Sequence, residues 1–184
     1  MTDIGATVLM GGGIDSAACA HLLQARGHAV GGVFINYGQA AAAHERRAVE
    51  ALTNRLQVPL AVHGVTNTAG FSSGELIGRN GFLIFAAVFL SRCHAGLLAI
   101  GVHAGTPYYD CSPSFIDAMS RLVAEHTDGT VSLVAPFLHW NKAEVFDYFA
   151  TSGLPLEATY SCEVGGEHPC GLCASCRDRR AIGC

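Results

Sequence analysis

Residues 6–16 read ATVLMGGGIDS, and this stretch decides the fold. Its apolar run, residues 6–10, predicts a short buried strand, and the apolar spacing after Ser16 predicts a helix. Gly11, Gly12 and Gly13 stand between them, where residues without side chains let backbone N–H groups approach an anion at a helix N-terminus. The stretch therefore predicts a phosphate site that includes Asp15 and Ser16. A tight turn capped by Asp15 or Ser16 is the alternative.

The rest of the chain alternates short apolar runs with helical segments. Further strands are expected at residues 29–35, 60–65, 97–102 and 131–134, and helices at 40–56, 81–94, 115–126 and 142–150. Such alternation predicts an α/β fold, a doubly wound parallel sheet with helices on both faces. The segment 66–74 is rich in Gly, Ser, Thr and Asn and predicts a loop.

Two of these helices differ in character. The helix at 40–56 carries four charged residues that we expect on its solvent face, namely Glu45, Arg46, Arg47 and Glu50. The helix at 81–94 is apolar almost all round, which predicts a buried helix.

Composition limits the possible functions. The 184 residues favour one domain with at most a small appendage, and a chain that is 50% hydrophobic and 14% charged is not disordered. A net charge of −4 argues against a nucleic-acid partner. The longest apolar run, residues 81–90, is half of the roughly 20 residues that a membrane span needs. The first residues carry an acid where a signal peptide has positive charge, so we expect a cytoplasmic protein.

Four of the eight cysteines cluster near the end of the sequence in the pattern C-x7-C-x2-C-x2-C: Cys162, Cys170, Cys173 and Cys176. Cysteines two residues apart can turn their sulfurs toward one point, and four thiolates suit tetrahedral zinc. An iron–sulfur cluster, disulfides or free thiols are the alternatives. The alternation of strands and helices stops near Gly153. We therefore expect an α/β domain over residues 1–152 and a zinc-binding segment over 153–184.

The motif GGGIDS resembles SGGxDS, the pyrophosphate loop of the N-type ATP pyrophosphatases. Further motifs narrow the resemblance to the 7-cyano-7-deazaguanine synthase (QueC) family of queuosine precursor biosynthesis. In chain order they are VFINYGQ at 33–39, GRN at 78–80, GV at 101–102, YDC at 109–111, FI at 115–116, KAE at 142–144, YSC at 160–162 and PCGLCASCR at 169–177. The resemblance covers nearly the whole chain in order, and the combination is far more specific than any one motif.

The resemblance implies a PP-loop α/β domain, a four-cysteine zinc site and a homodimer. The family's substrate is 7-carboxy-7-deazaguanine, whose carboxylate is adenylated by ATP with Mg²⁺. Ammonia then gives an amide, and a second adenylation permits dehydration to the nitrile. The protein's part in this chemistry is positioning and charge stabilisation.

The resemblance also implies site residues. Gly11, Gly12, Gly13, Asp15 and Ser16 would hold pyrophosphate with Lys142, and Asp15, Ser16 and Lys142 would act in catalysis. Arg79 and Asn80 would contact the nucleotide or the base. The remaining substrate-binding residues would be Tyr37, Gln39, Tyr109 and Asp110, with Asp110 accepting two hydrogen bonds from a guanine-like edge. Purely structural roles are the alternative for Lys142, Arg79, Asp110 and the tyrosines.

Several positions depart from the family pattern. Gly11 replaces the first serine of the loop, Asn36 replaces an acid, Ala40 and Ala41 replace a basic pair, and Ser112 replaces an arginine. These losses favour a divergent relative, of a kind associated with bacterial antiviral operons, that stops at the amide and joins the deazaguanine to a protein amine. An inactive nucleotide- or base-binding module, a tRNA-thiolating enzyme and a zinc-stapled interaction protein are further alternatives.

Overall fold

The structure is a computed structural model that describes residues 5–66, 71, 74, 76–91, 93 and 95–184. Its sheet has five strands: β1 Ala6–Leu9, β2 Val30–Asn36, β3 Leu60–Gly64, β4 Gly96–Ala99 and β5 Val131–Val134. All neighbours pair in parallel, in the order β3-β2-β1-β4-β5. The strand order therefore reverses beside β1. In open α/β sheets this reversal is the place where ligands bind, beyond the carboxyl ends of the strands.

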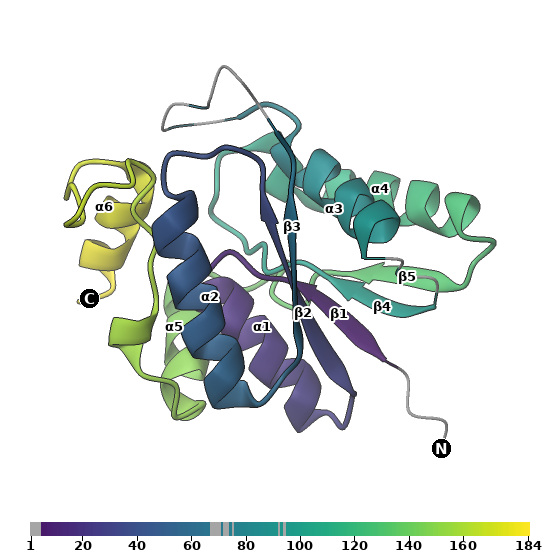
Figure 1. The fold of residues 1–184 in the computed structure, drawn as a ribbon, viewed down its shortest axis with the longest axis horizontal. Coiled ribbons are helices and arrows are strands. Elements are labelled where there is room, and N and C mark those ends of the chain that lie inside the picture. Colours follow the sequence, from purple (N-terminus) through teal and green to yellow (C-terminus); the bar gives the residue numbers. More distant parts are fainter. Residues whose placement is uncertain (1–4, 67–70, 72–73, 75, 92, 94) are drawn as a thin grey trace.

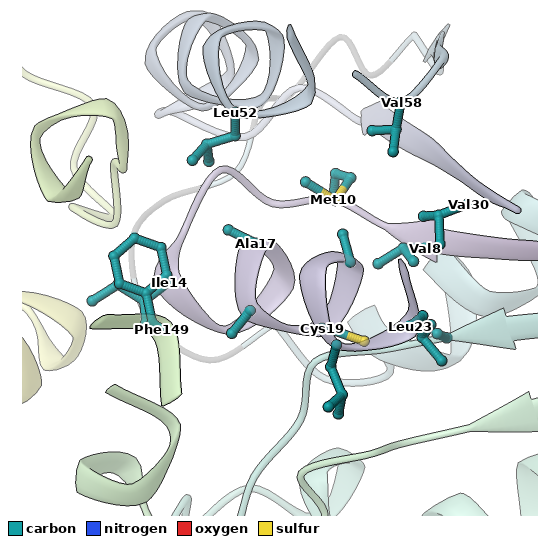
Figure 2. Packing of buried hydrophobic residues seen from close by; sticks show 14 of the residues in the cluster. Val8, Met10, Ile14, Ala17, Cys19, Leu23, Val30, Leu52, Val58 and Phe149 are labelled. Carbon is teal, nitrogen blue, oxygen red and sulfur yellow. The ribbon is translucent and has the colours of Figure 1, made fainter. Parts of the chain in front are cut away.

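Helices cover both faces of the sheet (Figure 1). One face carries α1 Ile14–Ala25, α2 Ala42–Leu56 and α5 Lys142–Thr151, and the other carries α3 Arg79–Leu90 and α4 Pro113–His126. Each face has its own apolar core. Figure 2 shows α1 in the middle of the first core, where Ala17 and Cys19 are fully buried. The predicted doubly wound α/β fold is confirmed.

The helix predicted at 81–94 differs from the expectation. It begins at Arg79 and ends at Leu90, and it is not buried on all sides. Ile84 and Ala87 face the core and are fully buried, whereas Phe82 is 41% and Phe89 82% exposed. The prediction was wrong for this face because α3 is an outer layer, and a helix in an outer layer meets the sheet along one stripe. Most of the loop predicted at 66–74 lies outside the described residues.

The C-terminal segment follows α5 and packs against the side of the sheet that α1 covers. It contains one turn of 3-10 helix, η2 Leu156–Ala158, and one short α-helix, α6 Ala174–Ala181. Several of its apolar side chains lie on the first core: Leu154, Leu156, Ala158, Ile182 and Cys184. The segment reaches α2, where the ring of His44 stacks on Tyr160 with centroids 4.8 Å apart. Among the described residues, no helix combines the length and the apolar character needed to cross a membrane.

A close approach between two backbones fixes the start of α1. Gly101 follows β4, and a Cβ added there would lie 2.9 Å from the carbonyl carbon and oxygen of Asp15. Only glycine leaves room for the turn after β4 to lie against the first turn of α1.

We expect Gly101→Ala to lower the melting temperature by several degrees. An added methyl group in packed surroundings costs about 1–3 kcal/mol, and each kcal/mol corresponds to roughly 2–4 °C for a chain of this size. Thermal denaturation checks this. Gly64→Ala is the matched control because a Cβ there has no atom within 4 Å. Equal melting temperatures for the two variants would contradict the close approach.

Candidate active site

The turn between β1 and α1, residues 11–16, is here called the glycine turn. Gly12 has φ +76°, and a Cβ on it would lie 2.8 Å from the carbonyl oxygen of Glu45. Glycine is therefore required both by the backbone angle and by the packing of α2 on the turn. The Ser16 hydroxyl accepts from the Gly11 N–H and donates to the Gly13 carbonyl, each at 3.2 Å.

No side chain caps α1, whose N-cap is Gly13. Ser16 does close the turn, because its hydroxyl binds the Gly11 N–H, so the alternative prediction of a turn capped by Ser16 applies to that one amide. The first N–H groups of a helix have no partner within the helix and carry partial positive charge. Apart from the Gly11 N–H, which Ser16 binds, the glycine turn presents amides without a side-chain cap among the described residues at the point where the strand order reverses, which is the arrangement of an anion-binding site.

Asp15 and Lys142 join the starts of two helices. The Lys142 Nζ lies 2.6 Å from Asp15 Oδ1 and 2.7 Å from Oδ2. The position of Lys142 is set by a capping box at the start of α5, in which Asn141 accepts from the Glu144 N–H and Glu144 accepts from the Asn141 N–H. Lys142 is the only lysine in the sequence. Both side chains are about a quarter exposed, so the pair is accessible to a ligand.

A cleft of about 340 Å³ opens beyond the glycine turn. All the residues predicted for phosphate, nucleotide and substrate line it except Gly12 and Tyr109: these are Gly11, Gly13, Asp15, Ser16, Tyr37, Gln39, Arg79, Asn80, Asp110 and Lys142. The structure thus brings together segments that lie up to 130 residues apart in the chain.

Asn80 and Asp110 bind each other. Asn80 is 3% exposed, its N–H donates to Asp110 Oδ2 at 3.1 Å, and its Nδ2 donates to the Asp110 carbonyl at 2.9 Å. The Asp110 carboxylate therefore stabilises the first turn of α3, whose N-cap, Gly78, has no side chain. One of its two oxygens is engaged in this way, and among the described residues the other contacts only the Cys111 thiol, at 3.8 Å.

Cys111 lines the cleft as a thiol. Burial raises its pKa to about 11, and the negative charge of Asp110 acts in the same direction. Cys111 therefore stays protonated at neutral pH and is a poor nucleophile.

Tyr37 and Arg79 both line the cleft. Burial raises the pKa of Tyr37, while the Arg79 guanidinium beside it acts in the opposite direction. Of the two neighbouring tyrosines, Tyr108 lines the cleft. Tyr109 is 66% exposed and packs edge-on against Phe115 with ring centroids 5.8 Å apart.

Glu45 faces the cleft, which corrects the expectation that it lies on the solvent face of α2. Gln39 Nε2 donates to Glu45 Oε2 at 2.7 Å, and both residues line the cleft. The signal was present in the helical spacing. Glu45 lies three and four residues before Ala48 and Val49, both buried, and therefore shares their face. Arg46 and Glu50 pair with each other on the exposed face, as expected.

The C-terminal segment supplies a wall of the cleft that the sequence analysis did not predict. The Tyr160 N–H donates to the Gly12 carbonyl at 2.8 Å, which ties the segment to the glycine turn. Arg179 donates to the Thr159 carbonyl and the Ser161 hydroxyl at 3.4 Å. Glu163 accepts from the N–H and the hydroxyl of Ser175.

The four predicted cysteines meet beside this wall. Their Sγ atoms all lie within 4.8 Å of one another. Cys162 Sγ accepts from the Cys170 N–H, and Cys170 Sγ accepts from the N–H groups of Leu172 and Cys173, at 3.3–3.4 Å. These N–H···S hydrogen bonds stabilise thiolates, so the donor set has the chemistry of a metal site.

Solved structures with a similar fold include the U34-tRNA thiolase NcsA of Methanococcus maripaludis with its [4Fe-4S] cluster. It matches with a TM-score of 0.60 and 15% identity over 100% of this chain and 69% of that one. A predicted subunit of a tRNA methyltransferase from Methanocaldococcus jannaschii matches with a TM-score of 0.52 and 15% identity over 80% of this chain and 76% of that one. At this identity the likeness shows the fold alone.

Relatives with higher sequence identity show the family of the chain. A 7-cyano-7-deazaguanine synthase of Prochlorococcus marinus is 34% identical over 98% of this chain and 93% of the relative. The synthase of Brucella anthropi is 30% identical over 94% and 86%. The profile of the family described as "Queuosine biosynthesis protein QueC" matches residues 5–81 and 76–182. The family predicted from the motifs is confirmed, and the chain belongs to the QueC family.

Proposed function

We propose that the protein is an AMP-forming ligase that adenylates the carboxylate of 7-carboxy-7-deazaguanine and joins it to nitrogen. One observation supports this most directly: the uncapped amides of the glycine turn open into the same cleft as Tyr37, Arg79 and Asp110. The groups proposed to bind a nucleoside triphosphate and those proposed to bind a flat, polar base therefore line one cleft. Membership of the QueC family supplies the substrate class.

The role of ATP in this reaction is to activate the substrate carboxylate. A carboxylate resists attack by an amine because its oxygen does not leave. When the carboxylate oxygen attacks the α-phosphorus of ATP, pyrophosphate departs, and the acyl adenylate that forms has AMP as its leaving group. Amides of the glycine turn would hold the departing pyrophosphate, and Lys142 would exchange part of its bond with Asp15 for a phosphate oxygen. Mg²⁺ accompanies the triphosphate.

The base would bind on the other side of the cleft. Asp110 Oδ1 is free of strong partners and can accept from a guanine-like N–H, while Oδ2 is held by α3. We therefore propose one direct hydrogen bond from this carboxylate, with Arg79 and Tyr37 beside it. Asn80 would act as a positioning residue that holds Asp110, because its own amide is already bound to the protein.

The nitrogen donor decides the product. Ammonia and a second adenylation lead to the nitrile, whereas a protein amine would stop the reaction at the amide. The departures at Gly11, Asn36 and Ser112 favour the shorter route. Product analysis by mass spectrometry separates nitrile, free amide and protein adduct. Binding of ATP or base without AMP release would instead identify an inactive binding module.

The homodimer implied by the family resemblance stays a prediction.

We further propose that the four cysteines bind zinc. They belong to a zinc-binding segment, residues 153–184, that packs on an α/β domain formed by residues 1–152. Four sulfurs at 2.3 Å from one tetrahedral ion stand about 3.8 Å apart, in keeping with sulfurs that all lie within 4.8 Å. A cubane cluster favours wider spacing because each sulfur binds a different iron. Zinc here would supply folding energy rather than chemistry.

We expect the protein with ATP, Mg²⁺, 7-carboxy-7-deazaguanine and an ammonium salt to release AMP and pyrophosphate only when the deazaguanine is present. Lys142→Ala should lower kcat/KM by about 100-fold or more, since it removes the side-chain cation nearest the glycine turn. Chromatography of the nucleotides measures both. Arg46→Ala is the control, because it removes an exposed cation on α2. Release of ADP, or full activity of Lys142→Ala, would refute this assignment.

Gly11→Ser restores the hydroxyl that the family pattern has. A Cβ at Gly11 meets no atom within 4 Å, so the change fits the fold. One added hydrogen bond to a charged phosphate contributes about 1.5–3 kcal/mol, so we expect the Kd for ATP to fall by about 10-fold or more. Isothermal titration calorimetry measures this. Gly11→Ala separates the hydroxyl from the added methyl, and the same Kd for Ser and Ala variants would show that the position does not reach the phosphates.

We expect one zinc per chain by elemental mass spectrometry. Cys173→Ser should reduce this zinc content strongly and lower the melting temperature, because structural metal binding contributes to folding. Cys93→Ser is the control, since Cys93 is buried outside the cluster. Stoichiometric metal in Cys173→Ser would contradict the four-thiolate site, and four irons with sulfide would identify a cluster instead.

A further inference from the structure

Glu45 is a half-buried carboxylate with one fixed oxygen and one free oxygen. Oε2 accepts from Gln39 Nε2 at 2.7 Å. The Gln39 amide is itself held, because its Oε1 accepts from the Tyr37 N–H at 2.9 Å and its Nε2 also lies 3.4 Å from the Ile35 carbonyl. Among the described residues, no other side chain hydrogen-bonds the Glu45 carboxylate. Gln39 thus orients Glu45, and Oε1 remains available to a ligand in the cleft.

Glu45 lies in the same cleft as the groups proposed to act on the phosphates. Its backbone carbonyl packs against Gly12, while its side chain lines the same cleft as Asp15 and Lys142. A molecule held by Glu45 is therefore in the cavity that receives the phosphates. The first turn of α2 has no other acid that reaches this cavity.

The charge of Glu45 does not suit a phosphate. Asp15 is neutralised by a bidentate ion pair with Lys142, whereas Glu45 has a neutral amide as its hydrogen-bond partner. A carboxylate in a cleft for a polyanion repels that ligand, and it attracts an ammonium group or an amine. Burial also raises the pKa of Glu45, although the bond from Gln39 and the charge of Arg79 act in the opposite direction. A raised pKa makes a carboxylate a better proton acceptor near neutral pH.

We propose that Glu45 is the general base for the nitrogen nucleophile. This inference rests on the proposed function. The amine nitrogen attacks the carbonyl carbon of the acyl adenylate, and a C–N bond forms as the C–O bond to AMP breaks. AMP leaves with the electron pair of that bond, and Glu45 takes the proton that the nitrogen loses. An amine delivered as ammonium gives one further proton to solvent before the attack, so that Glu45 is still ionised when the C–N bond forms.

The test separates the two half-reactions. Exchange of labelled pyrophosphate into ATP, with the deazaguanine acid present and no amine, reports adenylation alone. Amide formation with ammonia reports both steps. We expect Glu45→Gln to keep exchange within about 3-fold of wild type and to lose about 100-fold or more in amide formation, the range of a removed general base. Glu50→Gln is the control on the same helix, where Glu50 pairs with Arg46 in solvent.

Hydroxylamine provides a second readout. It is uncharged at neutral pH and attacks activated acyl groups without prior deprotonation, so hydroxamate formation by Glu45→Gln should fall much less than amide formation. Glu45→Asp keeps a carboxylate and should recover part of the amide rate. These two measurements also guard against a folding defect, which would lower exchange, hydroxamate and amide formation together.

Three results would overturn the proposal. Normal amide formation by Glu45→Gln would exclude a base at this position. Equal losses of exchange and amide formation, in a variant with the wild-type melting temperature, would place Glu45 in adenylation, for example as a ligand of Mg²⁺. Absence of exchange in the wild-type protein would refute the proposed function itself, and the role of Glu45 would fall with it.

Discussion

The free amides at the start of α1 are the feature on which the rest of the structure depends. They lie where the strand order reverses, and three backbone contacts hold the turn that carries them. Gly12 packs against the first turn of α2, Gly101 lies against Asp15, and the Tyr160 N–H binds the Gly12 carbonyl. Because each contact comes from a different part of the chain, the turn is rigid only in the complete fold.

The cysteine cluster and one wall of the cleft are built from the same stretch of chain. Cys162 lies two residues after Tyr160 and one before Glu163, while Cys176 follows Ser175, which Glu163 binds. A segment of about thirty residues cannot bury a core of its own large enough for stability. The segment packs apolar side chains on the first core and binds the glycine turn through Tyr160, and its four sulfurs form a candidate metal site in the same stretch of chain.

Four of the acidic side chains in the cleft are each held in a different way. Asp15 has an ion pair, Asp110 caps the first turn of α3, Glu163 binds Ser175, and Glu45 binds the amide of Gln39. These bonds orient the carboxylates before a ligand arrives, which lowers the reorganisation needed during reaction. Asp110, Glu163 and Glu45 each accept from neutral partners through one carboxylate oxygen, which leaves the other oxygen open to a ligand in the cleft.

Local spacing was enough to predict the glycine turn, the alternating strands and helices, and the four cysteines, because each of these patterns depends on neighbours in the chain. The sequence also carried the motifs that identify the family. Tertiary contacts decided the rest: Glu45 turns inward, Tyr109 points to solvent and the C-terminal segment walls the cleft. Phe89 stays exposed for the same reason. Which face of a helix is buried depends on the layer that it joins. Segments that are distant in the sequence are brought together by the strand order of the sheet, which local patterns do not contain.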